Sequence, residues 1–182
     1  MGSLKPPPGP GAYEFYVSIV GNKQGKFKGD SAKASRKDWI AALSFSYEVS
    51  SPRDAATGQA TGKRQHRPVT ITKEWGASSP QIFEAVVANE SLKSILFEFV
   101  TPAEDGTEHV HQKIKLTNAV VTSFKMYTAE HESTGHVFEL EDVSFTFQKI
   151  EIDNLTAGTA AEDASSTGRL PARFNTSTGS GT

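Results

Sequence analysis

The sequence predicts a mainly β protein, a two-sheet antiparallel β-barrel with one short flanking α-helix. Two observations lead to this prediction: apolar and polar residues alternate in seven or eight runs, and only one segment has apolar residues at helical spacing. The chain has 182 residues, 36% of them hydrophobic, so it can bury the core of a single domain.

The first strands are predicted from alternation with a period of two. Phe15, Val17 and Ile19 share one parity of the first run, and Leu43 and Phe45 share one parity of the second. Because successive side chains of a strand point to opposite faces, such runs indicate strands with one buried face. The runs in this part of the chain are residues 13–20, 43–50 and 69–72.

The second half of the chain continues the pattern, but its last run changes phase. Leu140 belongs to one parity, whereas Val143 and Phe145 belong to the other. We expect a β-bulge or a strand break near Glu141 and Asp142, because a slip of one residue moves side chains to the other face. The runs are residues 95–99, 110–116, 120–127 and 138–147.

One helix interrupts the series of strands. Ser79 can cap its start and Pro80 suits its first position, although Ser78 with Gln81 offers a competing start one residue earlier. Asn89 is the expected terminator. The predicted apolar face consists of Ile82, Phe83, Val86 and Val87.

Composition divides the chain into a domain and two ends. Residues 1–11 are rich in Pro and Gly, and we expect a flexible N-terminus there. Residues 12–153 form the predicted β-barrel domain. Residues 154–182 are rich in Thr, Ser, Ala and Gly, and we expect a disordered tail because such a segment buries too little apolar surface to offset its ordering entropy.

Composition also excludes several classes of protein. The absence of cysteine excludes a disulfide framework, a thiolate metal site and a cysteine nucleophile. A net charge of −2 argues against a generally basic nucleic-acid binder. The sequence has no apolar run of membrane-spanning length and no signal-peptide pattern at its start. We therefore expect a protein made in the cytoplasm that leaves, if it does, by another route.

No motif in the sequence predicts catalysis, a cofactor or a bound metal. The segment Gly58–Arg64 has only three residues between its glycines and lacks the Ser or Thr of a phosphate loop. His109 and His111 share one strand face and could bind a metal, but the alternative is a solvated face, since Lys113 continues the same parity. His66 is expected to be solvated.

Two polar connections, residues 21–38 and 50–67, hold ten of the 19 Lys and Arg residues. Long connections inside a compact domain are usually functional. Single-strand nucleic-acid binders combine basic grooves with aromatic platforms, and these connections contain one aromatic residue, Phe27. The alternative function is therefore a monomeric β-barrel binding module for single-stranded nucleic acid or oligosaccharide.

Charge is divided unevenly along the chain. Residues 1–73 contain twelve basic and five acidic residues (net +7), and residues 74–182 contain seven basic and sixteen acidic residues (net −9). If the two halves expose separate surfaces, identical copies could attract each other head to tail. If the β topology mixes the halves in space, the asymmetry has no such meaning.

Four blocks of sequence follow one another in a familiar order. They are Tyr16-Val17-Ser18-Ile19-Val20-Gly21 with Leu43-Ser44-Phe45-Ser46-Tyr47; His66-Arg67-Pro68-Val69-Thr70-Ile71-Thr72-Lys73 with Ser78-Ser79-Pro80; Leu116-Thr117-Asn118-Ala119 with Ser123-Phe124-Lys125-Met126-Tyr127; and Glu141-Asp142-Val143-Ser144-Phe145-Thr146-Phe147-Gln148-Lys149-Ile150. Together these blocks, over residues 13–152, resemble the haemolysin-coregulated protein (Hcp) family, the tube proteins of the bacterial type VI secretion system.

The resemblance implies a structural protein with no enzymatic activity. It implies hexameric rings that stack into a hollow tube, with other copies of the chain, a secretion spike, a sheath and effector proteins as partners, and no nucleic acid or membrane. The protein would be cytoplasmic before firing and then secreted without a signal peptide. A non-secreted relative, such as a tube component of a phage-derived particle, is the open alternative.

The connection 50–67 resembles the family's long loop, which reaches a neighbouring subunit or ring. We therefore predict that Arg53, Lys63, Arg64 and Arg67 contact acidic residues of another copy. The alternative is a solvated flexible loop, since exposed ion pairs contribute less than about 1 kcal/mol.

Overall fold

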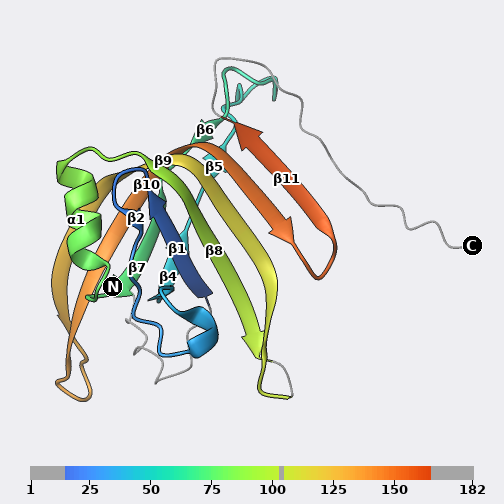
Figure 1. Ribbon diagram of the computed structural model, residues 1–182. Helices are drawn as coiled ribbons and strands as arrows, with labels where there is room; N and C mark the ends of the chain where they lie inside the picture. Colours follow the sequence, from blue (N-terminus) through green and yellow to red (C-terminus); the bar gives the residue numbers. More distant parts are fainter. Residues whose placement is uncertain (1–14, 103–104, 165–182) are drawn as a thin grey trace, which may run out of the picture.

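The computed structural model describes residues 15–102 and 105–164 (Figure 1). These residues form eleven β-strands, one α-helix and one short 3-10 helix. In chain order the elements are β1 (Phe15–Gly21), β2 (Gly25–Lys26), η1 (Ala34–Arg36), β3 (Ile40–Ala42), β4 (Ser44–Ser46), β5 (Val49–Ser50), β6 (Gln65–His66), β7 (Val69–Glu74), α1 (Ser79–Val87), β8 (Leu92–Pro102), β9 (Glu108–Glu130), β10 (Val137–Asn154) and β11 (Thr159–Ala164). The predicted flexible N-terminus, residues 1–11, lies outside the described residues.

Nine strands form one antiparallel sheet, in the order β2-β1-β8-β9-β10-β7-β4 with β3 beside β1 and β11 beside β10. Mainly antiparallel β structure with one short α-helix is thus confirmed. The predicted closed barrel is wrong, because residues 40–46 divide at Leu43: β3 pairs only with β1, and β4 pairs only with β7. Strands β5 and β6 form a separate two-stranded sheet.

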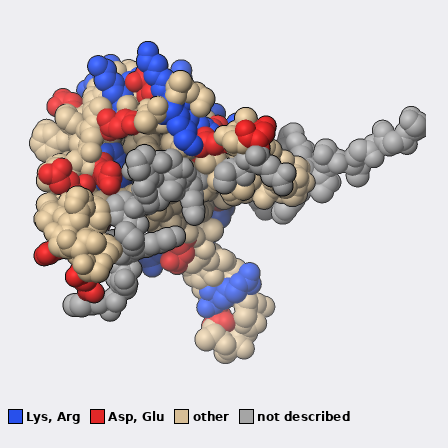
Figure 2. Space-filling view, turned by 90° about the horizontal axis from the view of Figure 1, so that it is seen from below, with Lys and Arg blue, Asp and Glu red and all other residues tan. Residues whose placement is uncertain are grey.

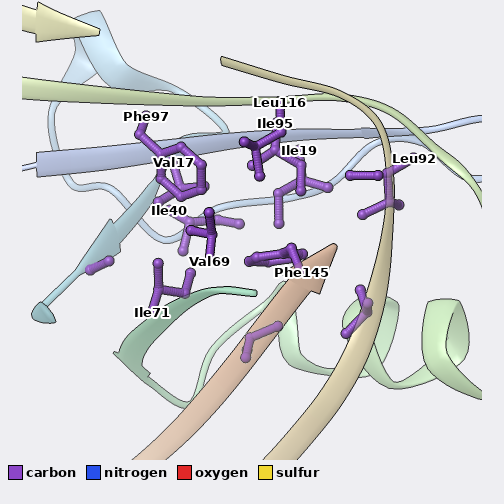
Figure 3. Close-up of a cluster of buried hydrophobic side chains, with 14 of the residues drawn as sticks. Val17, Ile19, Ile40, Val69, Ile71, Leu92, Ile95, Phe97, Leu116 and Phe145 are labelled. Atoms are coloured by element: carbon purple, nitrogen blue, oxygen red, sulfur yellow. The ribbon is translucent and has the colours of Figure 1, made fainter. Parts of the chain in front are cut away.

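The large sheet bends over one apolar core, shown in Figure 3. Side chains from β1 and β8 face side chains from β7 and β10 across this core. The alternation predicted from the sequence therefore places one parity of each strand inside. The side chains without exposed area include Val17, Ile19, Ile95, Phe97, Val69, Ile71 and Phe145.

Strand β9 unites two runs that the sequence predicts as separate strands. Asn118 adopts a positive φ of 49°, a conformation that Asn tolerates better than most residues, and the strand continues beyond it. β8 pairs with β9 only up to Ala119, whereas β10 pairs with β9 as far as Glu130. The second half of β9 therefore extends past the end of its neighbour β8.

Strand β10 also differs from its prediction. It runs without a break through Glu141 and Asp142, so the bulge or break expected there is wrong; the register shift lies between Ser144 and Phe145. The phase change in the sequence arises because both faces of β10 are buried at this point. Leu140 and Glu141 point to opposite faces, and their exposures are 3% and 0%.

Helix α1 begins with Pro80 in its first turn and is followed by Asn89 at a φ of 48°, as predicted. Ser78 precedes the helix and makes no capping hydrogen bond through its side chain, while the Ser79 hydroxyl accepts a hydrogen bond from the Gly76 N–H (2.9 Å). Ile82 is buried, but two members of the predicted apolar face are exposed, Phe83 at 54% and Val87 at 65%.

A charged pair lies inside the core beside the start of α1. Lys73 of β7 and Glu141 of β10 are directly opposite in register, with Nζ and Oε1 2.6 Å apart and exposures of 1% and 0%. Lys73 also donates a hydrogen bond to the Glu74 carbonyl (2.7 Å). Each side chain compensates the charge of the other, and removal of one partner would leave an unpaired polar group inside the core.

The predicted disordered tail is wrong for part of its length. Residues 159–164 form β11, which pairs with β10 from Lys149 to Asn154. Its composition offers little apolar surface, and it is held by backbone pairing, by an ion pair of Glu162 with Lys149 on β10, and by an ion pair of Asp163 with the distant Arg64. Residues 165–182 lie outside the described part of the chain.

Candidate assembly surfaces

The sheet face opposite the core carries charged residues in register across β8, β9, β10 and β11. Core residues of β9 alternate with Lys113 and Lys115, which therefore point to this outer face. The outer face pairs its charges locally: Lys113 with Glu98 (3.3 Å), Lys115 with Glu151 (3.9 Å), and Lys149 with Glu151 (3.1 Å) and Glu162 (2.7 Å). Hydrogen bonds to Glu162 and Glu151 raise the pKa of Lys149. The face is polar, yet its charges are largely compensated.

Residues 49–67 form a structured projection that we call the arm. Strands β5 and β6 pair at its base, and Arg53 and Ala60 form an isolated bridge further out. The Asp54 carboxylate accepts hydrogen bonds from the N–H groups of Thr57 (2.7 Å) and Ala56 (2.9 Å), which lower its pKa. Figure 2 shows a lobe with a group of Lys and Arg side chains projecting from the body, on the side where the arm lies.

The four predicted contact residues of the arm have different environments. Arg53 donates a hydrogen bond to the Gly58 carbonyl (3.1 Å), within the arm. Arg64 pairs through two nitrogens with the Asp163 carboxylate of its own β11. Lys63 and Arg67 are exposed, and among the described residues their side chains have no partner. Arg64 is thus paired within its own chain, and the contacts of the four residues with another copy remain predictions.

Asp163 also joins the arm to the sheet through His66. Its Oδ2 lies 2.9 Å from His66 Nε2, while His66 Nδ1 lies 2.7 Å from the Tyr47 hydroxyl. The His66 ring packs against Tyr47 and Phe147 and its side chain is only 14% exposed, so the expectation of a solvated histidine is wrong. We call Asp163, His66, Tyr47 and Arg64 the clasp.

Ionisation at the clasp follows from its contacts. Burial opposes ionisation of Asp163, but hydrogen bonds from Arg64 and His66 outweigh it and lower the pKa of that carboxyl. The same contact raises the pKa of Arg64, and burial raises the pKa of Tyr47. Sequence reasoning missed Tyr47 and Asp163, because 97 residues separate His66 from Asp163 and no local pattern links them.

The second half of β9 presents an open strand edge. Residues 120–130 pair with β10 on one side, and no strand of the described chain pairs with their other side. α1 lies next to this part of β9, where the Phe83 and Phe124 rings are 6.4 Å apart. Exposed apolar side chains gather here: Phe83, Val87 and Met126, the last at 46%. An open edge beside exposed apolar residues is typical of a surface that is covered in an assembly.

The turn between β9 and β10 is acidic. Residues 128–139, which we call the tip, contain three carboxylates, no Lys and no Arg. All three are exposed, and within the described residues none has a hydrogen bond or ion pair. Val137, also in the tip, is 54% exposed. The three acidic residues are Glu130, Glu132 and Glu139.

Other sites considered in the sequence gain no support. Within residues 15–102 and 105–164, no group of three or more His, Asp and Glu side chains is placed to hold a metal ion. His109 and His111 therefore do not belong to such a group. Phe27, the one aromatic residue of the polar connections, is fully buried and cannot stack on a base. No α-helix in the described part of the chain has the length and apolarity required to cross a membrane.

Comparison with known proteins gives a consistent result. Residues 16–153 match the model of a family described as "Type VI secretion system effector, Hcp". A "Major exported protein" of Pseudomonas aeruginosa is 31% identical over 159 residues, which cover 81% of this chain and 92% of that protein.

Solved structures of similar fold have related titles. A variant of Hcp1 from E. coli EAEC 042 aligns with a TM-score of 0.72 and 27% identity, covering 84% of this chain and 99% of that one. The secreted protein Hcp3 from Pseudomonas aeruginosa aligns with a TM-score of 0.66 and 26% identity, covering 82% and 98%. A "Crystal structure of Hcp protein" aligns with a TM-score of 0.75 at 24% identity, over 82% and 98%, which supports the fold alone.

Proposed function

Because this chain belongs to the Hcp family of type VI secretion system proteins, we propose that it forms hexameric rings that stack into a hollow tube. The single observation that supports ring formation most directly is the open edge of β9 at residues 120–130. Unpaired strand edges are templates for pairing with another chain, and a closed ring of identical copies covers such an edge in every copy.

The compensated outer face of the sheet suits the lining of the bore. Its lysines face glutamates on neighbouring strands, so a passing protein would meet water and paired charges rather than a field of one sign. We propose that effectors travel through this bore and that a spike and a sheath act with the tube. Export of this chain is supported by the name of its Pseudomonas aeruginosa relative. The proposed role is structural, without catalysis.

The alternative function, a monomeric module for single-stranded nucleic acid or oligosaccharide, is weakly supported. Phe27 is buried, and the arm contains no Phe, Trp or Tyr that could stack on a base or a sugar. The basic residues of the arm are better explained by the predicted contacts with acidic residues of another copy.

Native mass measurement and electron microscopy test the proposal. The wild-type chain should give particles of six times 19.6 kDa, seen as rings with an open centre. The double variant Phe83→Glu with Val87→Glu places charge beside the open edge without touching the core, and it should remain monomeric. Leu155→Glu is the matched control, since Leu155 is 46% exposed in the β10–β11 turn. Monomers of the wild type at every concentration would contradict the proposed function.

A further inference from the structure

The side of the molecule that carries α1 has an exposed apolar surface beside the open edge of β9. Phe83 and Val87 lie one turn apart on α1, at 54% and 65% exposure, and Met126 of β9 is 46% exposed. The Phe83 ring lies 6.4 Å from that of Phe124, which shares a strand face with Met126. With two neighbouring acidic residues these side chains form what we call the α1 patch: Phe83, Glu84, Val87, Met126 and Glu130.

The α1 patch is acidic as well as apolar. Glu84 belongs to the exposed side of α1, and Glu130 lies on the face of β9 that carries Met126. Both carboxylates are exposed, and within the described residues neither has a hydrogen bond or ion pair. Lys125 points to the opposite face of β9, where it lies over the Tyr127 ring at 5.2 Å. A segment that covers this patch should therefore combine apolar side chains with positive charge.

The segment after β11 has this composition. Residues 165–182, which lie outside the described part of the chain, contain two basic residues, no acidic residue and two large apolar side chains. These four are arranged as a repeated pair, Arg169-Leu170 and Arg173-Phe174. The family match ends at residue 153, and the similar solved structures align over 98–99% of their own length but over only 82–84% of this chain. A contact made by this segment would therefore be additional to those of the shared fold.

The surroundings of its starting point do not attract this segment. Arg64 donates a hydrogen bond to the Ala164 carbonyl (3.3 Å), so residue 165 follows directly beside the arm. The arm contains four basic residues and one acidic residue, and it repels a basic segment. The outer sheet face offers no unpaired acidic surface of comparable kind, because its lysines and glutamates pair locally. The α1 patch is the better electrostatic partner.

Leu170 cannot reach Met126 of its own chain. In register, Ala164 pairs with Lys149, and Lys149 pairs with Thr117 of β9. Met126 lies nine residues further along β9, about 30 Å from Thr117. Leu170 follows Ala164 by six residues, which span about 22 Å at most. Figure 1 agrees with this separation, since α1 and β11 lie at opposite sides of the sheet. The patch that this segment covers therefore belongs to another copy.

We infer that residues 169–174 of one copy bind the α1 patch of the neighbouring copy in the ring. The inference rests on the proposed function and names the segment that covers this side of the molecule. The two apolar side chains of the segment cover the apolar part of the patch, and its two arginines pair with Glu84 and Glu130. Because the ring holds each segment close to its neighbour, a short segment binds at a high effective concentration. The contact runs from each copy to the next, so a closed ring fills every patch.

Truncation tests the contribution of the segment to the ring. In a chain that ends at Ala164, the concentration at which half of the chains are in rings should rise about tenfold or more, because two buried anchors are lost. A chain that ends at Asn175 keeps residues 169–174 and should match the wild type. Native mass measurement over a dilution series gives these midpoints.

The outcomes separate the inference from the proposed function. Absence of rings in the wild type would contradict the proposed function itself. If the wild type forms rings and the chain ending at Ala164 has the same midpoint, the inference is overturned while ring formation stands. A loss as large in the chain ending at Asn175 would also overturn it, because the contact would then lie outside residues 169–174.

Cysteine cross-linking identifies the surface and the copy, since the natural chain has no cysteine. Oxidation of co-expressed chains, one with Phe174→Cys and one with Val87→Cys, should give linked heterodimers. Leu155→Cys in place of Val87→Cys is the matched control, because Leu155 is 46% exposed outside the patch, and it should give none. A single chain carrying Phe174→Cys and Val87→Cys should give a ladder of up to six linked chains. Disulfides formed only within one chain, or equal linking in the control, would overturn the inference.

Discussion

Strand β10 has an inner part and an outer part that are stabilised in different ways. From Leu140 to Phe145 it lies between β9 and β7, and from Lys149 to Asn154 it lies between β9 and β11. The inner part contains Val143 and Phe145, which have no exposed area. The outer part is flanked by ion pairs at Lys149. One strand thus joins a region held mainly by burial to a region in which ion pairs and backbone pairing add to the burial of Ile150.

The comparison shows where an amino-acid change matters for folding and where it matters for assembly. Buried contacts contribute several kcal/mol each, whereas exposed ion pairs contribute less than about 1 kcal/mol. The inner part therefore determines whether the chain folds. The outer part pairs with β11, whose Asp163 binds Arg64 of the arm. It therefore sets the position of the arm on the folded molecule.

Removing the buried cation of the inner part should have the largest effect. Lys73→Ala leaves the Glu141 carboxylate buried without its partner, and we expect a loss of about 3–5 kcal/mol in the free energy of unfolding. Replacing both residues, Lys73→Met with Glu141→Leu, should recover most of that loss, because no uncompensated charge remains. Denaturant unfolding at a fixed protein concentration measures both variants. A double variant as unstable as the single one would contradict this explanation.

A smaller loss in the free energy of unfolding is expected when the most buried apolar side chain of the outer part is shortened. Ile150 is 2% exposed, and Ile150→Val should cost about 0.5–1.5 kcal/mol because one methylene leaves the core. The same unfolding experiment measures it. A loss as large as that of Lys73→Ala would mean that the outer part also determines folding, against the comparison made above.

More of the fold than of the clasp could be predicted from the sequence. Alternation is a local signal, so the strands of the core and the short helix beginning near Ser79 were predictable. The continuity of β9 was not, because it depends on the backbone at Asn118. β11 has weak alternation, and its charged side chains are held by partners on other strands and in the arm: Glu162 pairs with Lys149 of the neighbouring β10, and Asp163 pairs with the remote Arg64. A local pattern cannot reveal a partner 99 residues away.

Asp163→Asn should have a small effect on stability and a clear effect on the arm. Because Arg64 is half exposed, loss of the charged pair should cost less than about 1 kcal/mol. The arm and β11 should nevertheless become easier to cleave, since the clasp no longer joins them. Limited proteolysis followed by mass spectrometry measures this, with Asp153→Asn as the control outside the clasp. Equal cleavage rates in the wild type and Asp163→Asn would show that the clasp does not hold the arm.

The smallest effect concerns acid pH and separates the charge of the clasp from its packing. The pKa of Asp163 is lowered in the folded chain, so its contribution to stability is fully present above the unfolded value of about 3.9 and is lost as the pH falls through the lower folded value. An NMR titration of the Asp163 carboxyl group should therefore give a midpoint below about 3.9. In Arg64→Gln that midpoint should rise, because a hydrogen bond and a positive charge are removed.

Asp54 is the internal control: its pKa is lowered by Thr57 and Ala56, and the substitution should leave it unchanged. An Asp163 midpoint that does not respond to Arg64→Gln would mean that packing of His66, and not charge, holds the outer part together.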